Sequence, residues 1–351
     1  MKDNKRFAPV PAYLPVNLRL FDGQTNVTTD SGLSDEMKTY YSDYLIDSAK
    51  PKLIHDQFGQ KHPIPKNGGK IIEFRKYDPL PKALNPLTEG VTPQGSKLSV
   101  SAITAEIHQY GDFVELSDVL LLTAIDNNLV QATQILGDQA GATLDTVVRE
   151  VLNGGTNVQY AEGQVTSRDQ LVGGDADATK NHYLSVKACK LAARFLKTQN
   201  AVQIDGSWVG IIHPDCSFDL TEDPDWKYPH QYQDTTELYE GEIGKVAGIR
   251  FVETTEAKKW ANAGKDTAAG SAGSRDVYST LILGANAYGV TEVEGGGLQH
   301  IVKQLGSAGT ADPLNQRATA GWKAILTAER LVEQFMVRIE TASTFSDGVA
   351  N

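Results

Sequence analysis

The segment DNNLVQATQILGDQAGATLDTVVREVL, residues 126–152, carries the strongest secondary-structure signal in the chain. Apolar residues recur along it at steps of three and four, which places them on one face of an α-helix. They are Leu129, Ala132, Leu136, Ala140, Leu144, Val147 and Val151. Asp126 or Asn127 can cap the start of this helix, and Gly154 and Gly155 can end it. At ~1.5 Å per residue, the helix is a rod of roughly 39 Å.

Residues 69–110, upstream of this helix, have the pattern of a long β-hairpin with a tip rich in proline and glycine. In its second arm the alternation of apolar residues changes phase, which moves them from one face of the strand to the other. The first face carries Leu98, Val100 and Ala102, and the second carries Ile103, Ala105 and Ile107. A β-bulge would explain this change. Alternatively, one end packs on its own domain and the other end on a neighbouring molecule.

Residues 1–65 lack the periodicity of a folded unit except over 34–47, where Ser34 can cap a short helix. Prolines interrupt the rest of this segment, at positions 9, 11, 15, 51, 63 and 65. The pattern predicts an extended arm, which must lie on another surface because it has no core of its own. The first three prolines also break any apolar run at this end, so we expect no signal peptide.

Helix and strand patterns alternate after residue 182. The spacing predicts an amphipathic helix over 183–199, whose apolar face is formed by Leu184, Ala188, Leu191, Ala192 and Phe195. A buried strand over 207–213 leads into a helix over 214–221 that begins with proline. The remaining predictions are a polar loop over 156–182, two short strands with glycine turns over 241–254, an exposed flexible loop over 257–276, and strands over 277–284 and 335–339. This is the pattern of a mixed α and β protein.

Composition narrows the function. The 351 residues suffice for one large or two ordinary domains. The net charge of −11 argues against tight binding to nucleic acid, which depends on lysine and arginine displacing counterions. Cys189 and Cys216 lie in apolar segments, so we expect buried free thiols and a reducing compartment. No apolar run approaches the ~20 residues that span a bilayer, so we expect no membrane partner.

The glycine-rich segment 293–322 raises the question of a phosphate-binding loop. Its six glycines are not followed by Gly-Lys-Ser/Thr at the spacing that a P-loop requires. The seven histidines are scattered and form no metal-binding pair. His213 and Asp215 stand at a strand end, where a strand-to-helix turn explains them without catalysis. We therefore predict no catalytic residue, no cofactor, no metal site and no enzyme activity.

Four motifs together resemble a known family. They are GDFVELSDVLLLTAID (111–126), LGDQAGATLDTVVREVLNGGTNVQYA (136–161), GEIGKVAGIRFVETT (241–255) and GGGLQHIVKQLGSAGTADPLNQRATAGWKA (295–324). In this order and at these intervals they resemble the major capsid proteins of tailed double-stranded DNA bacteriophages, in the branch that includes the podophages. The resemblance runs from about Gly111 to Thr341.

The resemblance implies an α+β fold, the tailed-phage major capsid fold, with five parts. They are an N-terminal arm (1–65), an extended β-hairpin loop (66–110), a peripheral domain with the long spine helix (111–182 and 301–342), an axial domain (183–300) and a C-terminal tail (343–351). The function it implies is structural: copies of the chain assemble into pentamers and hexamers of an icosahedral head. The head encloses double-stranded DNA without sequence-specific binding.

The resemblance also implies partners and a location. Because only about 65 proline-rich residues precede the hairpin, we expect a separate scaffolding protein rather than a fused scaffolding segment. A portal and, in some relatives, decoration proteins are further expected partners. The protein would be assembled in the bacterial host cytoplasm and reside in the virion.

Candidate inter-subunit contacts fall in three places. We expect Arg75, Lys76 and Lys97 on the hairpin to meet the acidic surface of a neighbour. We expect Glu242, Lys245 and the 257–276 segment near the capsomer axis. Finally, Asp312, Asn315 and Arg317 should tie down the glycine-rich segment or meet a neighbour, with the glycines allowing tight turns and positive φ.

Two other functions stay open at this point. An encapsulin-like nanocompartment would share the fold and enclose an enzyme cargo instead of DNA. An α/β enzyme would use the strand ends near His213.

Overall fold

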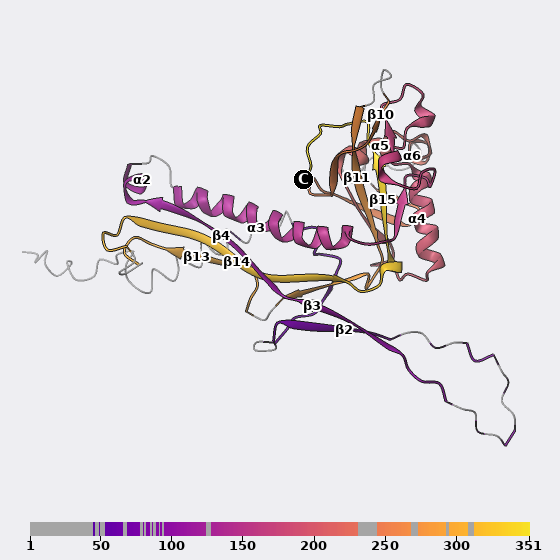
Figure 1. Ribbon diagram of the computed structural model, residues 1–351, viewed down its shortest axis with the longest axis horizontal. Helices are drawn as coiled ribbons and strands as arrows, with labels where there is room; N and C mark the ends of the chain where they lie inside the picture. Colours follow the sequence, from indigo (N-terminus) through magenta and orange to yellow (C-terminus); the bar gives the residue numbers. More distant parts are fainter. Residues whose placement is uncertain are drawn as a thin grey trace, which may run out of the picture.

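The computed structural model describes residues 45, 49, 53–65, 69–77, 80, 82–84, 86, 89–90, 92, 95–123, 128–230, 244–267, 273–292, 295–307 and 312–351. The predicted helix over 34–47 falls almost entirely outside these residues; Leu45, at its end, and Ala49, just beyond it, are helical and buried. The capping residues Asp126 and Asn127 lie outside them as well. Within the described ranges, two β-sheets, a projecting hairpin and one long helix define the architecture (Figure 1).

The predicted long helix is confirmed as α3, Asn128–Asn153. It lies along a five-stranded sheet, here called the long sheet (Figure 1). The sheet has the order β1 (Gln60–Lys61), β12 (Tyr288–Glu292), β14 (Arg317–Arg330) and β13 (Gln299–Lys303), and β4 (His108–Ser117) also pairs with β14. The apolar face of α3 is buried against this sheet because Leu136, Leu144 and Val148 share a cluster with Trp322 and Leu326. The helix therefore stiffens the sheet along its length.

The second sheet has eight strands. Its order is β5 (Val158–Tyr160), β15 (Met336–Ala342), β11 (Gly273–Leu283), β7 (Trp208–Ile212), β9 (Ile249–Glu253) and β8 (Lys245–Val246). Off this path, β10 (Lys259–Asp266) pairs with β11 and with β6 (Val172–Gly173). The prediction for 335–339 is right about a strand, but β15 is buried on both faces rather than alternating. A strand of a sheet that is covered on both faces reads as continuously apolar.

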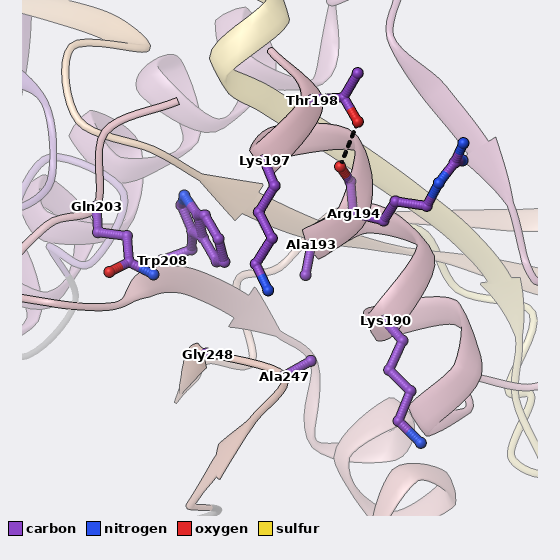
Figure 2. Close-up of a pocket in the computed structure, with 9 residues that line it drawn as sticks. All are labelled: Lys190, Ala193, Arg194, Lys197, Thr198, Gln203, Trp208, Ala247 and Gly248. Atoms are coloured by element: carbon purple, nitrogen blue, oxygen red, sulfur yellow. Dashed lines mark hydrogen bonds between the residues drawn. The ribbon is translucent and has the colours of Figure 1, made fainter. Parts of the chain in front are cut away.

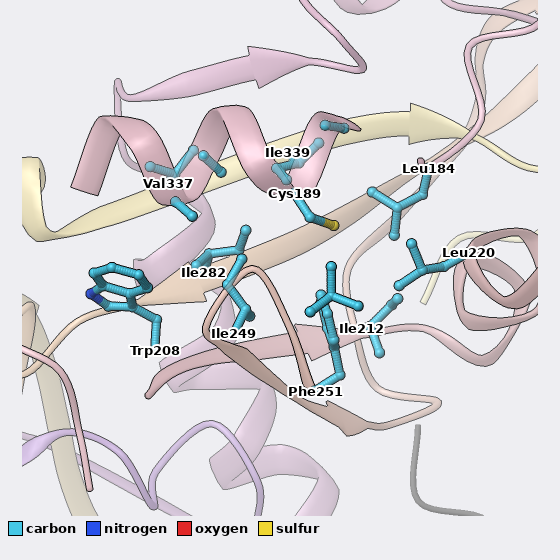
Figure 3. Packing of buried hydrophobic residues seen from close by; sticks show 14 of the residues in the cluster. Leu184, Cys189, Trp208, Ile212, Leu220, Ile249, Phe251, Ile282, Val337 and Ile339 are labelled. Atoms are coloured by element: carbon cyan, nitrogen blue, oxygen red, sulfur yellow. The ribbon is translucent and has the colours of Figure 1, made fainter. Parts of the chain in front are cut away.

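Three helices accompany the eight-stranded sheet: α4 (Val186–Thr198), α5 (Pro214–Glu222) and α6 (Pro224–His230). Figure 3 shows the core beneath them, in which Cys189 of α4 packs with Ile249, Ile282 and Ile339 of the sheet. The buried face of α4 is rotated from the predicted one. Leu191 and Phe195 are only half-buried, whereas Cys189, Ala193 and Leu196 are buried beside the predicted Ala188 and Ala192. Both cysteines are free and buried, as expected.

The prediction of an exposed flexible loop over 257–276 is wrong. β10 and the first part of β11 form an antiparallel hairpin there, paired from Lys259↔Tyr278 to Asp266↔Gly273. Few large apolar residues are needed because the backbone pairing and buried polar contacts hold it. The side chain of Asp276, fully buried, accepts hydrogen bonds from the backbone N–H groups of Asn262, Asp347 and Gly348 at 2.9 Å.

The 156–182 segment was predicted as a loop and contains short strands as well. β5 pairs in parallel with β15, and β6 pairs in parallel with β10. Strands of two or three residues are too short to show a period in the sequence. The segment is therefore attached to the eight-stranded sheet at two places, to β15 through β5 and to β10 through β6.

The hairpin is confirmed in its paired part. β2 (Ile71–Tyr77) and β3 (Val100–Glu106) are antiparallel, in continuous register from Ile71↔Glu106 to Tyr77↔Val100. No register shift interrupts this pairing, so a bulge does not explain the change of phase. At the base of the hairpin Ala105 is buried, whereas Val100 and Leu98 are exposed.

Part of the predicted arm lies on its own chain. The carboxylate of Asp145 on α3 accepts the backbone N–H groups of Ile54 at 2.8 Å and His55 at 2.7 Å, and its second oxygen lies 2.6 Å from His55 Nδ1. Both side chains are fully buried. The Tyr288 hydroxyl donates to the carbonyl of His55, and β1 pairs in parallel with β12. Residues 53–65 therefore find their surface on α3 and the long sheet.

Candidate assembly surfaces

The hairpin presents the first candidate surface. Ile71, Leu98 and Val100 are exposed along β2 and the second arm, and Leu80 and Leu84 are exposed in the connecting segment. Toward the tip, Leu98 and Val100 are left uncovered on the second arm, whereas Phe74 and Ala105 nearer the base are buried. A cavity of about 210 Å³ lies at that base, between Phe74 and Leu331. The hairpin is therefore anchored at one end and apolar at the other.

The second candidate surface is at the end of the long sheet that carries α2 (Asp118–Thr123), where β4 ends and β14 begins (Figure 1). We call it the distal tip. Its exposed apolar residues are Phe113, Val114, Val119, Leu120, Leu122, Ile301, Leu305 and Leu314. Phe113 and Val114 are adjacent in β4 and point to opposite faces of the sheet, yet both are exposed. At this point the face of β4 that carries Phe113 is left uncovered, whereas α3 lies against the opposite face.

The distal tip is costly to leave in water. Burying a Leu, Val or Phe side chain contributes about 1.5–3 kcal/mol, so covering this surface would contribute on the order of 10 kcal/mol. Large exposed apolar patches mark protein–protein contacts. The distal tip is thus a candidate protein-binding surface.

Polar contacts fix the geometry between α3 and the sheet next to the tip. The Gln139 side chain donates to Asp112 Oδ2 at 2.7 Å and accepts from Trp322 Nε1 at 3.2 Å. The hydrogen bond from Gln139, with a further one from the backbone N–H of Phe113, lowers the pKa of Asp112. One α3 side chain thereby links β4 and β14.

The predicted hairpin residues lie where expected in the chain. Arg75 is exposed in β2, and its Nε lies 3.2 Å from Glu73 Oε1. Lys76 pairs with Ser101 across the hairpin, and its side chain is outside the described part of the chain. Lys97 is exposed just before β3. These three do not form a cluster with the other predicted residues, and their contact with a neighbour stays a prediction.

Glu242 lies outside the described residues, whereas Lys245 is exposed in β8. The ammonium of Lys245 donates to the carbonyl of Gly206 at 3.1 Å. Its contact with a neighbour stays a prediction too.

The structure brings Asp312, Asn315 and Arg317 together in one turn. The buried carboxylate of Asp312 accepts the backbone N–H of Arg317 at 2.8 Å, and the Asn315 N–H donates to the Asp312 carbonyl at 3.1 Å. Asn315 has a φ of 53°, and Gly306, which lies against it, has a φ of 86°. The turn is therefore held within its own chain, which was the first of the two predicted roles. The second, contact with a neighbour, stays a prediction.

Sequence reasoning missed the distal tip. A signal for it is present in the sequence, where Val119, Leu120 and Leu122 belong to an apolar run that is too short to span a membrane. Across the described residues, no helix has the length and apolarity to cross a membrane. An apolar run that is too short for a membrane and lies on a short helix is instead a candidate protein contact.

His213 and the two cysteines have structural environments. The His213 Nδ1 accepts the backbone N–H of Asp215 at 3.2 Å and so caps α5. Burial raises the pKa of Cys189 to about 12 and raises that of Cys216 as well, which keeps both thiols protonated and unreactive. In the ranges described, no group of three or more His, Cys, Asp or Glu residues is arranged to hold a metal ion.

Several solved structures with a similar fold are phage capsids. The capsid of the cyanophage P-SCSP1u matches with a TM-score of 0.60 at 14% identity, over 83% of this chain and 88% of that one. The capsid of Ralstonia phage GP4 has a TM-score of 0.58 at 15% identity, over 85% and 90%. The capsid of the cyanophage Pam1 has a TM-score of 0.57 at 14% identity, over 85% and 93%. The expected tailed-phage capsid fold is confirmed.

The family follows from the sequence itself. The phage capsid protein family matches residues 122–305, more than half of the chain. No curated protein matches the chain. The chain belongs to the phage capsid protein family, and it is a structural component of the shell of a phage head.

Proposed function

We propose that copies of this chain form pentamers and hexamers that close into an icosahedral head. The observation that carries this proposal is the apolar distal tip, which its own chain leaves uncovered at the end of a rigid helix and sheet. Head-to-tail contacts between unlike surfaces, such as a tip and a hairpin, generate rings when the rotation closes. Assembly, rather than catalysis, is the activity that we propose.

We propose a role for each of the predicted parts of the chain. We assign residues 1–65 to an N-terminal arm, 66–110 to a loop that reaches over a neighbour, 111–182 and 301–342 to the peripheral domain, 183–300 to the axial domain and 343–351 to a tail. Two observations support the assignment: the base of the hairpin is anchored while its apolar face is exposed, and α3 runs along the long sheet. Arg75, Lys76 and Lys97 would meet a neighbour through the hairpin.

The axial and glycine-rich residues have their own proposed contacts. Glu242 and Lys245 would lie near the capsomer axis, and the turn of Asp312, Asn315 and Arg317 would support the distal tip from behind. The exposed position of Lys245 at the sheet edge supports its part of this proposal.

The proposed partners are a separate scaffolding protein, a portal, packaged double-stranded DNA and, in addition, decoration proteins. The net charge of −11 supports a wall that confines DNA without holding it tightly. Assembly is proposed to take place in the host cytoplasm, which agrees with the two buried, unpaired cysteines.

Substitution of the distal tip tests this proposal. Leu122 is 83% exposed, so Leu122→Glu should leave the subunit folded, as measured by circular dichroism and thermal melting. It should prevent shells from forming, as seen by negative-stain electron microscopy, because a charge would be buried without a partner. Val202→Glu, at a site that is 60% exposed outside the tip, is the matched control and should still assemble. Normal shells from Leu122→Glu would count against the proposal.

Neither alternative gains support. The family match is to phage capsid proteins, which does not favour an encapsulin-like compartment. The His213 side chain caps a helix, which gives it a structural task rather than a catalytic one.

A further inference from the structure

A groove of about 650 Å³ lies on the face of the eight-stranded sheet that α4 covers. It runs between α4 and the turn that joins β8 to β9. Figure 2 shows its walls: Lys190, Arg194 and Lys197 come from α4, Trp208 from β7, and Ala247 and Gly248 from the turn. We call it the cationic groove. None of the roles described so far uses it.

The three α4 cations of the groove belong to a longer stripe on that helix. Lys187, Lys190, Arg194 and Lys197 are exposed and recur at steps of three and four, so they share one face of α4. Lys245 and Arg250, which are also exposed, face each other across β8 and β9 beside the same turn. Positive charge is therefore concentrated here on a chain whose net charge is −11.

Part of this charge is neutralised by the protein, since Lys187 Nζ lies 2.6 Å from Glu162 Oε2. No described carboxylate lies within salt-bridge distance of Arg194, Lys197 or Arg250. Lys190 pairs with Asp225 at 3.3 Å, but both side chains are more than half exposed, and such pairs contribute little. Lys197 lies 5.6 Å from the centre of the Trp208 ring, which orients it along the groove. The groove thus offers positive charge to a ligand from outside the chain.

We propose that the cationic groove contacts the phosphodiester backbone of duplex DNA without reading its sequence. From Lys190 to Lys197 the helix rises about 10 Å, a length over which one DNA strand presents about three phosphates. The three α4 cations that line the groove therefore face a matching number of charges. The inference rests on the proposed function, in which DNA fills the shell.

The lining argues against base recognition and against a peptide partner. Trp208 is only 3% exposed, so its ring cannot stack on a base. The other walls are small residues and the stems of long cations, which provide no deep pocket for the apolar anchor that a bound peptide needs. A regularly charged polymer held through its phosphates fits this surface better.

The test uses salt dependence. Unassembled protein is titrated against a short fluorescent duplex of mixed sequence while ionic strength is varied from roughly 50 to 200 mM. In the triple variant Lys190→Gln, Arg194→Gln, Lys197→Gln, the slope of log K against log salt should become shallower by about 2.7, because each phosphate contact contributes about 0.9. Glutamine is a good helix former, so α4 should persist in this variant.

The control variant removes the same number of positive charges as the groove variant. Lys180→Gln, Lys265→Gln, Lys303→Gln removes three exposed cations outside the groove and should leave the slope unchanged. An unchanged slope in the groove variant, or an equal change in both variants, would overturn the inference. So would loss of shells from the groove variant alone with normal DNA binding, since the groove would then contact protein. Failure of the wild type to form shells would instead contradict the proposed function.

Discussion

Asp145 is the residue that joins the arm to the body of the subunit. It lies fully buried in the middle of α3 and accepts two backbone N–H groups and the His55 ring. An aspartate inside an apolar helix face looks like an irregularity in the sequence. Its partners lie 90 positions away, so sequence periodicity could not identify its role.

Removing this carboxylate should be costly. Asp145→Ala leaves buried donors without an acceptor and should lower the free energy of unfolding by about 3 kcal/mol, measured by urea denaturation. The control, Gln131→Ala, changes an exposed residue of the same helix and should stay within about 0.5 kcal/mol. Equal stabilities of the two variants would refute the anchoring role.

The tail that covers the β10–β11 hairpin contains a second ionic contact. Lys259, which is buried, donates to both carboxylate oxygens of Asp347 at 2.7 and 2.9 Å. This hydrogen bond lowers the pKa of Asp347 to about 2. Because the pKa in the folded state lies below the ordinary value of 3.8 for aspartate, the contribution of this contact to stability is present above about pH 4 and is lost as pH falls through 2.

We therefore expect residues 343–351 to loosen in acid before the core does. Hydrogen exchange measured by mass spectrometry should show protection of this tail decreasing between pH 4 and pH 2. Asp347→Asn should remove that pH dependence while leaving the protection of β15 unchanged. A tail whose protection is the same at pH 2 and pH 5 in the wild type would be inconsistent with this account.

At the scale of elements, the second strand of the hairpin carries two kinds of apolar residue: Ala105 is buried, whereas Val100 is exposed. Ala105→Lys places a charge at a site that is 4% exposed and should destabilise the subunit by more than about 2 kcal/mol. Val100→Lys, at a site that is 48% exposed on the same strand, should leave the stability of the subunit unchanged and weaken assembly. Thermal melting and electron microscopy distinguish the two. Loss of stability in both variants would mean that the exposed face already packs on its own chain.

Helices and strands whose apolar residues recur at regular steps could be predicted from the sequence. Strands whose buried polar groups are satisfied by residues far away in the sequence could not. The spacing identified α3, α4, β7 and the pairing of β2 with β3. The β10–β11 hairpin was missed because its buried polar residues, such as Asp276, are satisfied by the tail some 70 positions away. The distal tip was missed because an apolar residue that the fold leaves exposed looks the same in sequence as one that it buries.

At the scale of the whole molecule, the exposed surfaces and the fold agree. The long sheet with α3 carries the distal tip at one end, the hairpin projects from the same sheet, and the eight-stranded sheet forms a separate layered unit (Figure 1). The distal tip and the outer part of the hairpin expose apolar side chains that the subunit itself does not cover. Contact with other subunits would remove these side chains from water. The family and the similar capsid structures are consistent with that conclusion.

Cryo-electron microscopy of the purified wild-type protein, expressed with and without its neighbouring genes, tests the central claim most directly. The account predicts closed shells, tubes or capsomer rings in which Leu122 and Phe113 of the distal tip are covered by an adjacent subunit. Particles that are only discrete monomers or dimers, with the distal tip in solvent, would contradict it.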